Sequence, residues 1–383
     1  MLSASVLVFL ASLAFSVYIL LGYPLLLAVL ARRDHEVRRR FEPRTVSVLL
    51  TVYNGEKWIR DKLRSILSLD YPRELMQVIA ISDGSTDGTD DIVREFKEQG
   101  VELLRVPRGG KAAALNAGLR QARGEVLFFT DVRQPLDAGC LKSLVCCLGD
   151  PSVGAACGHV YFLGGKEEQQ AHMGLYWRYE KWIRLNHTRI HSIQAGTGCI
   201  YAMRRELAAP VPPDTLLDDS YLPLCAFFRG YRFVFDTGAI AYEYPTTLDA
   251  EFHRKVRTLA GIYQLIGIFP ALIGPGNRMW IHFVSHKLGR LLAPFALILM
   301  AISSFGLPGA WRPAAIAAQG AFYLAAALDS CIPASWPVKR ISSLARTFVV
   351  LMAAALCAVA IFFVPARKLW KETQTARPPA PSP

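Results

Sequence analysis

The stretch "TVSVLLTVYN" (residues 45–54) is an apolar, β-branched run that ends in two polar residues, Tyr53 and Asn54. Its length and composition are typical of a buried parallel strand. The next stretch, "GEKWIRDKLRSILSL" (55–69), has apolar residues that recur with helical spacing. A buried strand followed directly by an amphipathic helix indicates the start of an alternating α/β fold.

The same pattern then repeats. An apolar strand within 77–83 leads through the turn residues 84–89 into a helix that stops at Gly100. Strand 101–107, helix 111–124 and strand 125–131 follow. This order predicts an α/β, Rossmann-like domain with a mainly parallel sheet that is covered on both faces. Ligands of such sheets bind at the carboxyl ends of the strands. The polar residues at those ends are Tyr53 and Asn54, Asp83 to Ser85, and Asp131.

The two ends of the chain are strongly apolar. Residues 2–31 contain no charged residue and stop at "RRDHEVRRR" (32–40). Because about 20 apolar residues cross a bilayer core, this run predicts an uncleaved membrane anchor rather than a signal peptide, whose apolar core is shorter. Three further segments, 291–310, 314–332 and 344–364, are long enough to span.

These features predict five regions along the 383 residues. They are a transmembrane anchor (1–31), a globular domain (32–257), interfacial helices (258–287), C-terminal transmembrane helices (288–365) and a basic, proline-rich tail (366–383). The arginine cluster at 32–40 places the globular domain in the cytoplasm. The basic tail also favours the cytoplasm, but one span before the domain and three after it would put the tail on the opposite side. Either one segment does not span or 258–276 also inserts.

The formal net charge of +12 has two explanations. Lysines and arginines beside the membrane attract anionic lipid, or a cationic surface attracts anionic substrates. Nucleic-acid binding is not favoured, because the basic residues flank membrane segments rather than one soluble helix. The eight cysteines lack paired spacing and are predicted to be free thiols.

Three stretches carry candidate chemistry, each with a structural alternative. "SDGSTDGTDD" (82–91) offers a strand-end acid for a ribose or a base edge, or an ordinary turn with helix caps. Lys111 stands before a helix and suits an anion, or is a solvated lysine. Asp218 and Asp219 open a predicted helix, where they provide a general base or only stabilise the helix dipole.

The succession "TVYNGE", "SDGSTDGT", "GGKAAALNAGL", "FFTDVRQ", "GTGCIYAMRREL" and "LLDDSYLPLCAFFRGYRFVFD", set between apolar ends, resembles the membrane-integrated family-2 glycosyltransferases. That group includes cellulose-, chitin- and hyaluronan-synthase-like enzymes. The resemblance covers about residues 45–265. It implies a GT-A fold, a nucleotide-sugar donor (usually a UDP-sugar), a divalent cation, Mg²⁺ or Mn²⁺, and inversion at the anomeric carbon.

Carried over by position, the resemblance assigns roles to individual residues. The donor would be bound by Thr51, Tyr53, Glu56, Asp83, Lys111, Asp131 and Arg133. Asp131, the first acid of the D-x-D motif, would hold the metal. Asp219 would be the catalytic base, with Asp218 beside it in place of the family's glutamate. The acceptor or the diphosphate would be met by Gly196, Thr197, Gly198, Arg254 and Arg257.

Two motifs depart from the family pattern. Arg133 stands where D-x-D has its second acid, which puts metal dependence in doubt. Arg254 and Thr258 stand where the family's Gln-x-x-Arg-Trp motif has glutamine and tryptophan. The loss of that tryptophan puts long-polymer synthesis in doubt. The cluster of Arg254, Lys255 and Arg257 would meet the diphosphate or anchor a helix on lipid.

The sequence therefore predicts an inverting glycosyltransferase of the cell inner membrane with its catalytic domain in the cytoplasm. Its partners would be a nucleotide-sugar donor, a glycan or lipid-linked acceptor and membrane lipids. A processive exopolysaccharide synthase and a single-addition glycolipid transferase both remain open, as do the sugar, the linkage and the oligomeric state. The alternative from another class is a non-catalytic relative that binds nucleotide-sugar or scaffolds a synthase complex.

Overall fold

The computed structural model describes residues 3–32, 35–163, 167–244, 248–333 and 335–369. Its described residues form two compact units. The sheet unit contains those within 31–164 and 184–245, and the helical unit contains those within 3–30, 167–183 and 248–369. Helix α7 (Glu167–Ile190) contributes residues to both units.

Within the described residues, the sheet unit holds a seven-stranded sheet in the order β3-β2-β1-β4-β6-β5-β7. The strands are β1 (Val46–Val52), β2 (Met76–Asp83), β3 (Val101–Val106), β4 (Val126–Asp131), β5 (Val153–Phe162), β6 (Tyr201–Arg204) and β7 (Arg232–Glu243). Strands β1 to β4 pair in parallel, and β5 pairs in parallel with β7. Of the seven described strands, only β6 runs antiparallel to its neighbours, β4 and β5. The predicted α/β fold with a mainly parallel sheet is confirmed.

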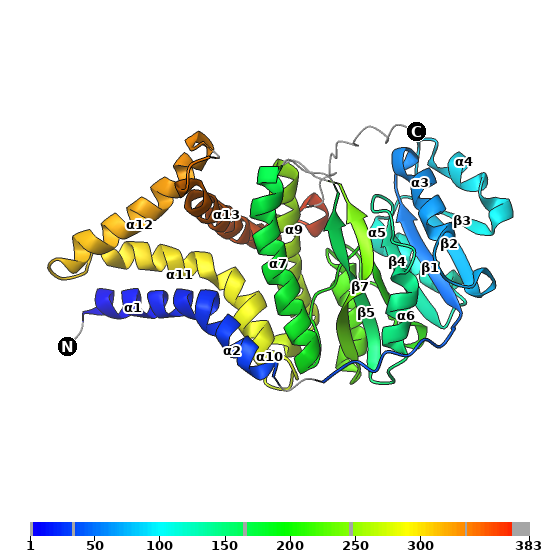
Figure 1. Ribbon diagram of the computed structural model, residues 1–383, viewed down its shortest axis with the longest axis horizontal. Helices are drawn as coiled ribbons and strands as arrows, with labels where there is room; N and C mark the ends of the chain where they lie inside the picture. The colour runs from blue at the N-terminus through cyan, green and yellow to red at the C-terminus, as the bar shows by residue number, and fades with distance from the viewer. Residues whose placement is uncertain (1–2, 33–34, 164–166, 245–247, 334, 370–383) are drawn as a thin grey trace. The chain divides into compact units, whose positions relative to one another are not determined.

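Helices cover both faces of this sheet (Figure 1). Alternate residues of β1, including Val48 and Leu50, are buried in one cluster with Leu63 of α3 (Glu56–Leu67) and Leu144 of α6 (Cys140–Leu148). The short helix α4 (Thr89–Arg94) contributes to the same cluster. Helix α5 (Lys111–Gln121) packs on the opposite face, where a Cβ at Gly118 would lie 2.3 Å from Ile81 Cδ1. Strands that are buried on both faces have continuous apolar runs in the sequence.

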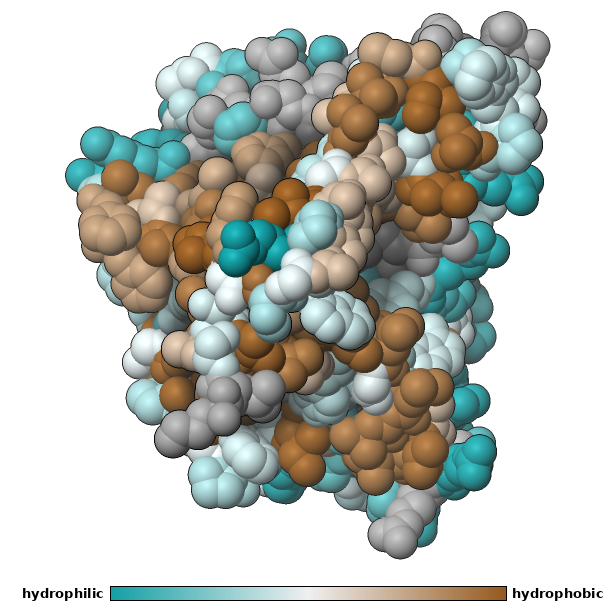
Figure 2. Space-filling model, turned by 90° about the vertical axis from the view of Figure 1, so that its left-hand side faces the viewer, coloured by the Kyte–Doolittle hydropathy of each residue, from teal (hydrophilic) through white to brown (hydrophobic). Residues whose placement is uncertain are grey.

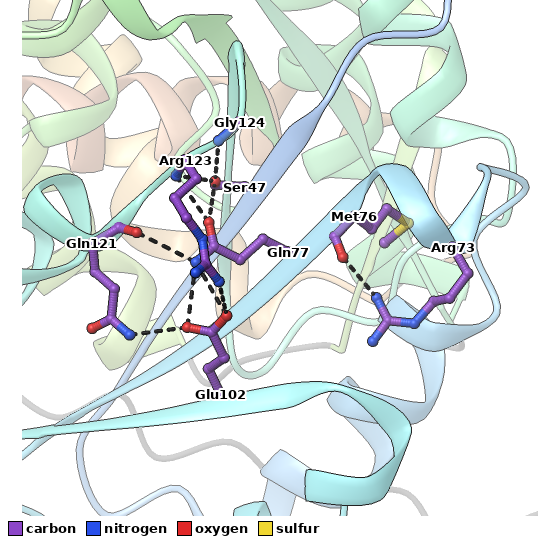
Figure 3. A network of polar contacts seen from close by, with 8 residues as sticks. All are labelled: Ser47, Arg73, Met76, Gln77, Glu102, Gln121, Arg123 and Gly124. Carbon is purple, nitrogen blue, oxygen red and sulfur yellow. Dashed lines mark hydrogen bonds and ion pairs between the residues drawn. The ribbon is translucent and has the colours of Figure 1, made fainter.

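A polar network ties together the amino ends of the strands (Figure 3). Ser47 Oγ of β1 donates to Gln77 Oε1 of β2 at 2.7 Å and accepts from the N–H of Gly124 at 2.8 Å. Glu102 of β3 accepts from Gln77 Nε2 at 3.2 Å and pairs with Arg123 at 2.6 Å. These bonds fix the register of β1, β2 and β3 at the edge opposite the strands' carboxyl ends.

The helical unit contains the two apolar ends of the chain. Helix α1 (Ala4–Val17) continues through a π-helical turn (Tyr18–Gly22) into α2 (Tyr23–Leu30) and lies alongside α11 (Gly289–Ser304) (Figure 1). Helix α12 (Trp311–Leu328) packs against α13 (Val338–Cys357), which also contacts α9 (Leu248–Ile268). The single helix α9 runs through the predicted boundary at 257/258.

Four helices within the described residues are long and apolar enough to cross a membrane. They are Ala4–Leu30, Trp280–Ser304, Trp311–Cys331 and Val338–Phe362. One near the start of the chain and three after the sheet unit agree with the predicted order, although the second begins earlier than expected. Apolar side chains of these helices face outward: Leu21, Leu25 and Ile302 are 62%, 69% and 64% exposed. Figure 2 shows broad apolar areas on the face it presents.

Polar contacts inside the helical unit link its helices. Glu180 of α7 pairs with Arg290 at 2.5 Å, and both residues are largely buried. Tyr23 Oη lies 3.1 Å from His282 Nδ1, and Tyr18 Oη lies 2.7 Å from Ser285 Oγ. Polar groups that are buried in an apolar bundle need such partners, so these pairs fix α7, the first helix and the 280–304 helix to one another.

Candidate active site

The predicted site residues of the sheet unit gather at the carboxyl ends of β1, β2 and β4. Thr51 pairs in register with Asp131, so the last residues of β1 and β4 lie side by side. Asp83 is the last residue of β2, and Tyr53 follows β1. Lys111 is the first residue of α5. The parallel sheet therefore delivers these side chains to one edge, as the sequence predicts.

Lys111 bridges two carboxylates. Its Nζ lies 3.0 Å from Asp131 Oδ1 and 3.2 Å from Asp218 Oδ1. Burial lowers the pKa of Lys111, but the attraction of Asp131 and then Asp218 outweighs it, and the pKa is raised. Burial likewise opposes the charge of Asp131, yet Lys111 holds its pKa below the usual value. Lys111 and Asp131 are therefore both charged at neutral pH.

Asp219 lies in the first turn of α8 (Asp218–Phe228), next to Asp218. Burial, followed by repulsion from Asp218 and partly offset by Lys111, raises the pKa of Asp219 to about 6. A carboxylate with a pKa near neutrality is suited to accept a proton and release it again. The paired acids thus differ, since Asp218 faces a cation while Asp219 remains available as a base.

The predicted loop Gly196–Thr197–Gly198 lies against Asp219. A Cβ at position 196 would lie 2.4 Å from the backbone oxygen of Asp219, and one at 198 would lie 3.2 Å from Oδ2. Only glycine permits this approach at 196. Arg184, which no sequence pattern indicated, donates to Thr197 Oγ1 at 2.6 Å and to the Gly196 carbonyl at 3.3 Å. Arg184 thereby holds the loop over the acid.

A second group of contacts surrounds Asp83. Its Oδ1 accepts from the N–H groups of Gly109 at 2.8 Å and Gly110 at 3.2 Å, and its Oδ2 pairs with Arg108. The Arg108 guanidinium stacks on Tyr53, with Cζ 3.6 Å from the ring centroid. The predicted nucleobase contacts, Tyr53 and Asp83, are thus adjacent and share Arg108. No sequence pattern indicated this arginine beyond its position ahead of "GGK".

Glu56 makes a contact within the same edge of the sheet. Its Oε2 accepts from the N–H of Gly88 at 3.0 Å, while its own N–H donates to Asp87 at 3.1 Å. These bonds join the start of α3 to the 82–91 turn. Direct donor binding by Glu56 stays a prediction.

Arg133 lies two residues past Asp131, and its charge contributes to the lowered pKa of Asp131. Its Nη1 is buried and has no hydrogen-bond partner among the described residues. Two hydrogen bonds hold the loop that carries Arg133 in place. Buried Lys62 donates to the Gln134 carbonyl, and Gln134 Nε2 donates to Glu243 Oε2 at 2.7 Å. A buried guanidinium N–H without a protein acceptor indicates a place for an anionic ligand.

The remaining predicted residues, Arg254 and Arg257, lie on α9 in the helical unit. Arg254 pairs there with Glu251, one turn earlier on the same helix. Their role toward the acceptor or the diphosphate stays a prediction.

The side chains around Asp131 do not form a usual divalent-cation site. Mg²⁺ and Mn²⁺ favour sets of carboxylate and carbonyl oxygens. Within the described residues, no cluster of three or more His, Cys, Asp or Glu side chains is arranged to hold a metal. Instead, the ammonium group of Lys111 occupies the space between Asp131 and Asp218, and Arg133 replaces the second acid. This donor set fits an anion better than a divalent cation.

Comparison with known proteins shows which family this part of the chain resembles. Residues 47–210 match the family described as glycosyl transferase family 2. This part of the chain is similar to family-2 glycosyltransferase domains. This segment holds most of the sheet unit, including Lys111, Asp131 and the Gly196–Gly198 loop. Asp218 and Asp219 follow directly after it.

Named relatives of the family-2 domain include two bacterial proteins. The probable glycosyltransferase YdaM of Bacillus subtilis (strain 168) is 26% identical over 240 residues, which is 56% of this chain and 54% of YdaM. The poly-beta-1,6-N-acetyl-D-glucosamine synthase of Staphylococcus epidermidis is 41% identical over 95 residues, which is 24% of this chain and 22% of that protein. The chain thus spans about half of the first relative and less of the second.

Among solved structures, the mannosyltransferase PcManGT from Pyrobaculum calidifontis, determined with GDP-Man and Mn²⁺, has a TM-score of 0.70 and 23% identity. The match covers 91% of this chain and 99% of PcManGT. This similarity shows that the two chains share a fold, and it confirms the predicted GT-A domain accompanied by helices.

Proposed function

We propose that the chain is a membrane-bound inverting glycosyltransferase. It moves a sugar from a nucleotide sugar, first of all a UDP-sugar, to a hydroxyl group of a glycan or lipid-linked acceptor. The observation that carries this proposal is the cluster of Lys111, Asp131, Asp218 and Asp219 at the strand ends of a family-2 domain. The cluster combines one fixed cation for a diphosphate, Lys111, with one carboxylate of near-neutral pKa, Asp219.

Asp219 is the catalytic base of the proposed reaction. Its carboxylate takes the proton of the acceptor hydroxyl, and the acceptor oxygen forms a bond to the anomeric carbon. The bond from that carbon to the diphosphate oxygen breaks on the opposite face, and the nucleoside diphosphate leaves with the electron pair. The Gly196–Gly198 loop, held by Arg184, shapes the space above Asp219 in which the hydroxyl binds.

Lys111 and Arg133 stabilise the leaving diphosphate. Lys111 is held between Asp131 and Asp218, and the buried Nη1 of Arg133 has no acceptor among the described residues. Preorganised cations lower the barrier because they meet the charge as it develops on the leaving group. Since the residues around Asp131 do not fit a divalent cation, we propose that the enzyme depends less on Mg²⁺ or Mn²⁺ than a relative with two acids.

The proposed location is the cell inner membrane, with the family-2 domain on the cytoplasmic side. The four apolar helices support membrane insertion, and the arginines at 32–40 support the side. The helical unit would form an acceptor groove or a short channel, with membrane lipids around it.

The alternative is a non-catalytic relative that binds nucleotide sugar or scaffolds a synthase complex. The incomplete D-x-D motif supports it, whereas the paired Asp131, Asp218 and Lys111 and the raised pKa of Asp219 favour catalysis.

The test uses purified full-length protein and a panel of labelled nucleotide sugars. Donor hydrolysis, and label entering lipid or polymer in membranes, are measured for the wild type, Asp219→Asn and the control Asp91→Asn. Asp91 is an exposed acid on α4, and its side chain is 82% exposed. The proposal expects Asp219→Asn alone to lose turnover. If the wild type binds nucleotide but its hydrolysis and label transfer equal those of Asp219→Asn and the blank, the non-catalytic alternative is correct.

A further inference from the structure

Arg108 occupies a position that the donor's base would need. Its guanidinium lies flat on Tyr53, 3.6 Å from the ring centroid, and its Nη1 donates to Asp83 Oδ2. Tyr53 supplies an aromatic face and Asp83 supplies an acceptor. Those are the two partners that a planar base with an N–H edge takes from a protein.

The guanidinium group has the same two properties as such a base. It is planar, it stacks on aromatic rings, and its N–H groups lie in its plane and pair with carboxylates. A base that is stacked on Tyr53 and bonded to Asp83 would therefore fill the same volume as the guanidinium. The two cannot use this face of Tyr53 and this oxygen of Asp83 at the same time.

The remaining acceptor capacity of Asp83 is small. Its side chain is 4% exposed, and its two oxygens already accept from the backbone N–H groups of Gly109 and Gly110. A Cβ at Gly84 would lie 2.8 Å from the backbone nitrogen of Arg108, so the backbone of the 107–110 loop is closely packed on the end of β2. The loop backbone is held by these contacts, whereas the Arg108 side chain is 52% exposed and borders the solvent.

We propose that the Arg108 side chain stands in for the nucleobase in the free protein and is displaced when the donor binds. Arg108 thereby sets the affinity for the base. This inference rests on the proposed function, because it requires a nucleotide to bind at Tyr53 and Asp83. It adds a competitor that every base must displace before it reaches Asp83.

The expected magnitude follows from the two contacts that are lost. An exposed cation–π contact and a partly exposed ion pair each contribute about 0.5–1 kcal/mol, so their removal tightens base binding by about 5- to 30-fold. Arg108→Lys keeps the charge but loses the flat stack, and it is expected to fall between the wild type and Arg108→Ala.

The test is calorimetric titration of the purified full-length protein in detergent with UMP, UDP and inorganic pyrophosphate. Arg108→Ala and Arg108→Lys are compared with the wild type and with Arg123→Ala. Arg123 is a matched control, because it is also an arginine in an ion pair, with Glu102, but at the opposite edge of the sheet (Figure 3). The proposal expects Arg108→Ala to bind UMP and UDP more tightly while pyrophosphate affinity does not rise.

Unchanged or weaker UMP binding by Arg108→Ala would overturn the inference and leave the proposed function standing. In that case Arg108 contacts the bound nucleotide or takes no part in binding. If neither the wild type nor any variant binds a nucleoside diphosphate from a panel of five bases, the donor site itself is refuted, and this inference falls with it. If Arg108→Ala also bound pyrophosphate more tightly than the wild type, Arg108 would not compete with the base alone, and the inference would be wrong.

Discussion

The near-neutral pKa of Asp219 predicts how the transferase rate depends on pH. Protonated Asp219 cannot accept a proton, so kcat/KM falls as the pH falls through the pKa of about 6. About nine tenths of Asp219 is ionised at pH 7 and about one tenth at pH 5, so kcat/KM should drop roughly tenfold between them. An unperturbed aspartate, with a pKa of about 3.9, would lose less than a tenth of its activity over that range.

Two substitutions should move this midpoint in opposite directions. The pKa of Asp219 is raised from 3.8 by about two pH units, first by burial and next by repulsion from Asp218, while Lys111 lowers it. Asp218→Asn removes the repulsion and frees Lys111, so the midpoint should fall by about one pH unit, less than the full perturbation. Lys111→Met removes the opposing cation, and the midpoint should rise above 6.

The assay is the initial rate at low donor concentration from pH 4.5 to 9 at constant ionic strength. Both variants touch the diphosphate region and will be slower overall, so the position of the midpoint, not the height of the profile, is the readout. Asp91→Asn should keep the wild-type midpoint. A wild-type profile that is flat between pH 5 and 8, or midpoints that move together in the two variants, would refute the role of Asp219 as the base.

Three further predictions follow from single contacts. Arg133→Asp restores a second acid near Asp131, so Mn²⁺ binding, measured by calorimetry, should tighten and the rate should rise with Mn²⁺. The wild-type rate should largely survive EDTA. An unchanged metal response of the variant would show that Arg133 points away from the site. Arg290→Met leaves the buried charge of Glu180 without its 2.5 Å partner and should destabilise the protein by about 3 kcal/mol or more. The measurement is the midpoint of thermal unfolding in detergent, which should be lower. An unchanged midpoint would show that this pair is dispensable. Gly198→Ala brings a methyl group to 3.2 Å from Asp219 Oδ2 and should lower kcat several-fold while UDP affinity stays the same, and a loss of UDP affinity would contradict this division of the site.

The first four strands could be predicted because their burial on both faces makes them continuous apolar runs. The other three could not. Strand β5 contains Gly154, Ala155, Ala156 and Gly158, whose small side chains give no clear apolar pattern, and β6 has four residues. The predicted boundary at 257 falls inside α9, because α9 carries a polar first half and an apolar second half that read as separate elements.

The site was predictable where it depends on local order along the chain. Residues just past parallel strands must share one edge of the sheet, so Tyr53, Asp83 and Asp131 followed from the alternating pattern alone. The contact between Lys111 and Asp218 joins residues 107 positions apart and depends on how α8 packs. No local signal encodes such a contact. The stacking of Arg108 on Tyr53 could not be predicted either, because it also joins residues that are far apart in the sequence.

The charges around Asp131 are the reason for the proposal that this chain needs a divalent cation less than a two-acid relative does. A second acid next to Asp131 would need a divalent cation to offset both carboxylates and the diphosphate. Here Lys111 lies between Asp131 and Asp218, and Arg133 adds a positive charge, fixed to the chain, at the position of the second acid. A fixed charge is present at any metal concentration. Salt still screens it, so the donor affinity of this enzyme should vary with ionic strength more than with metal concentration.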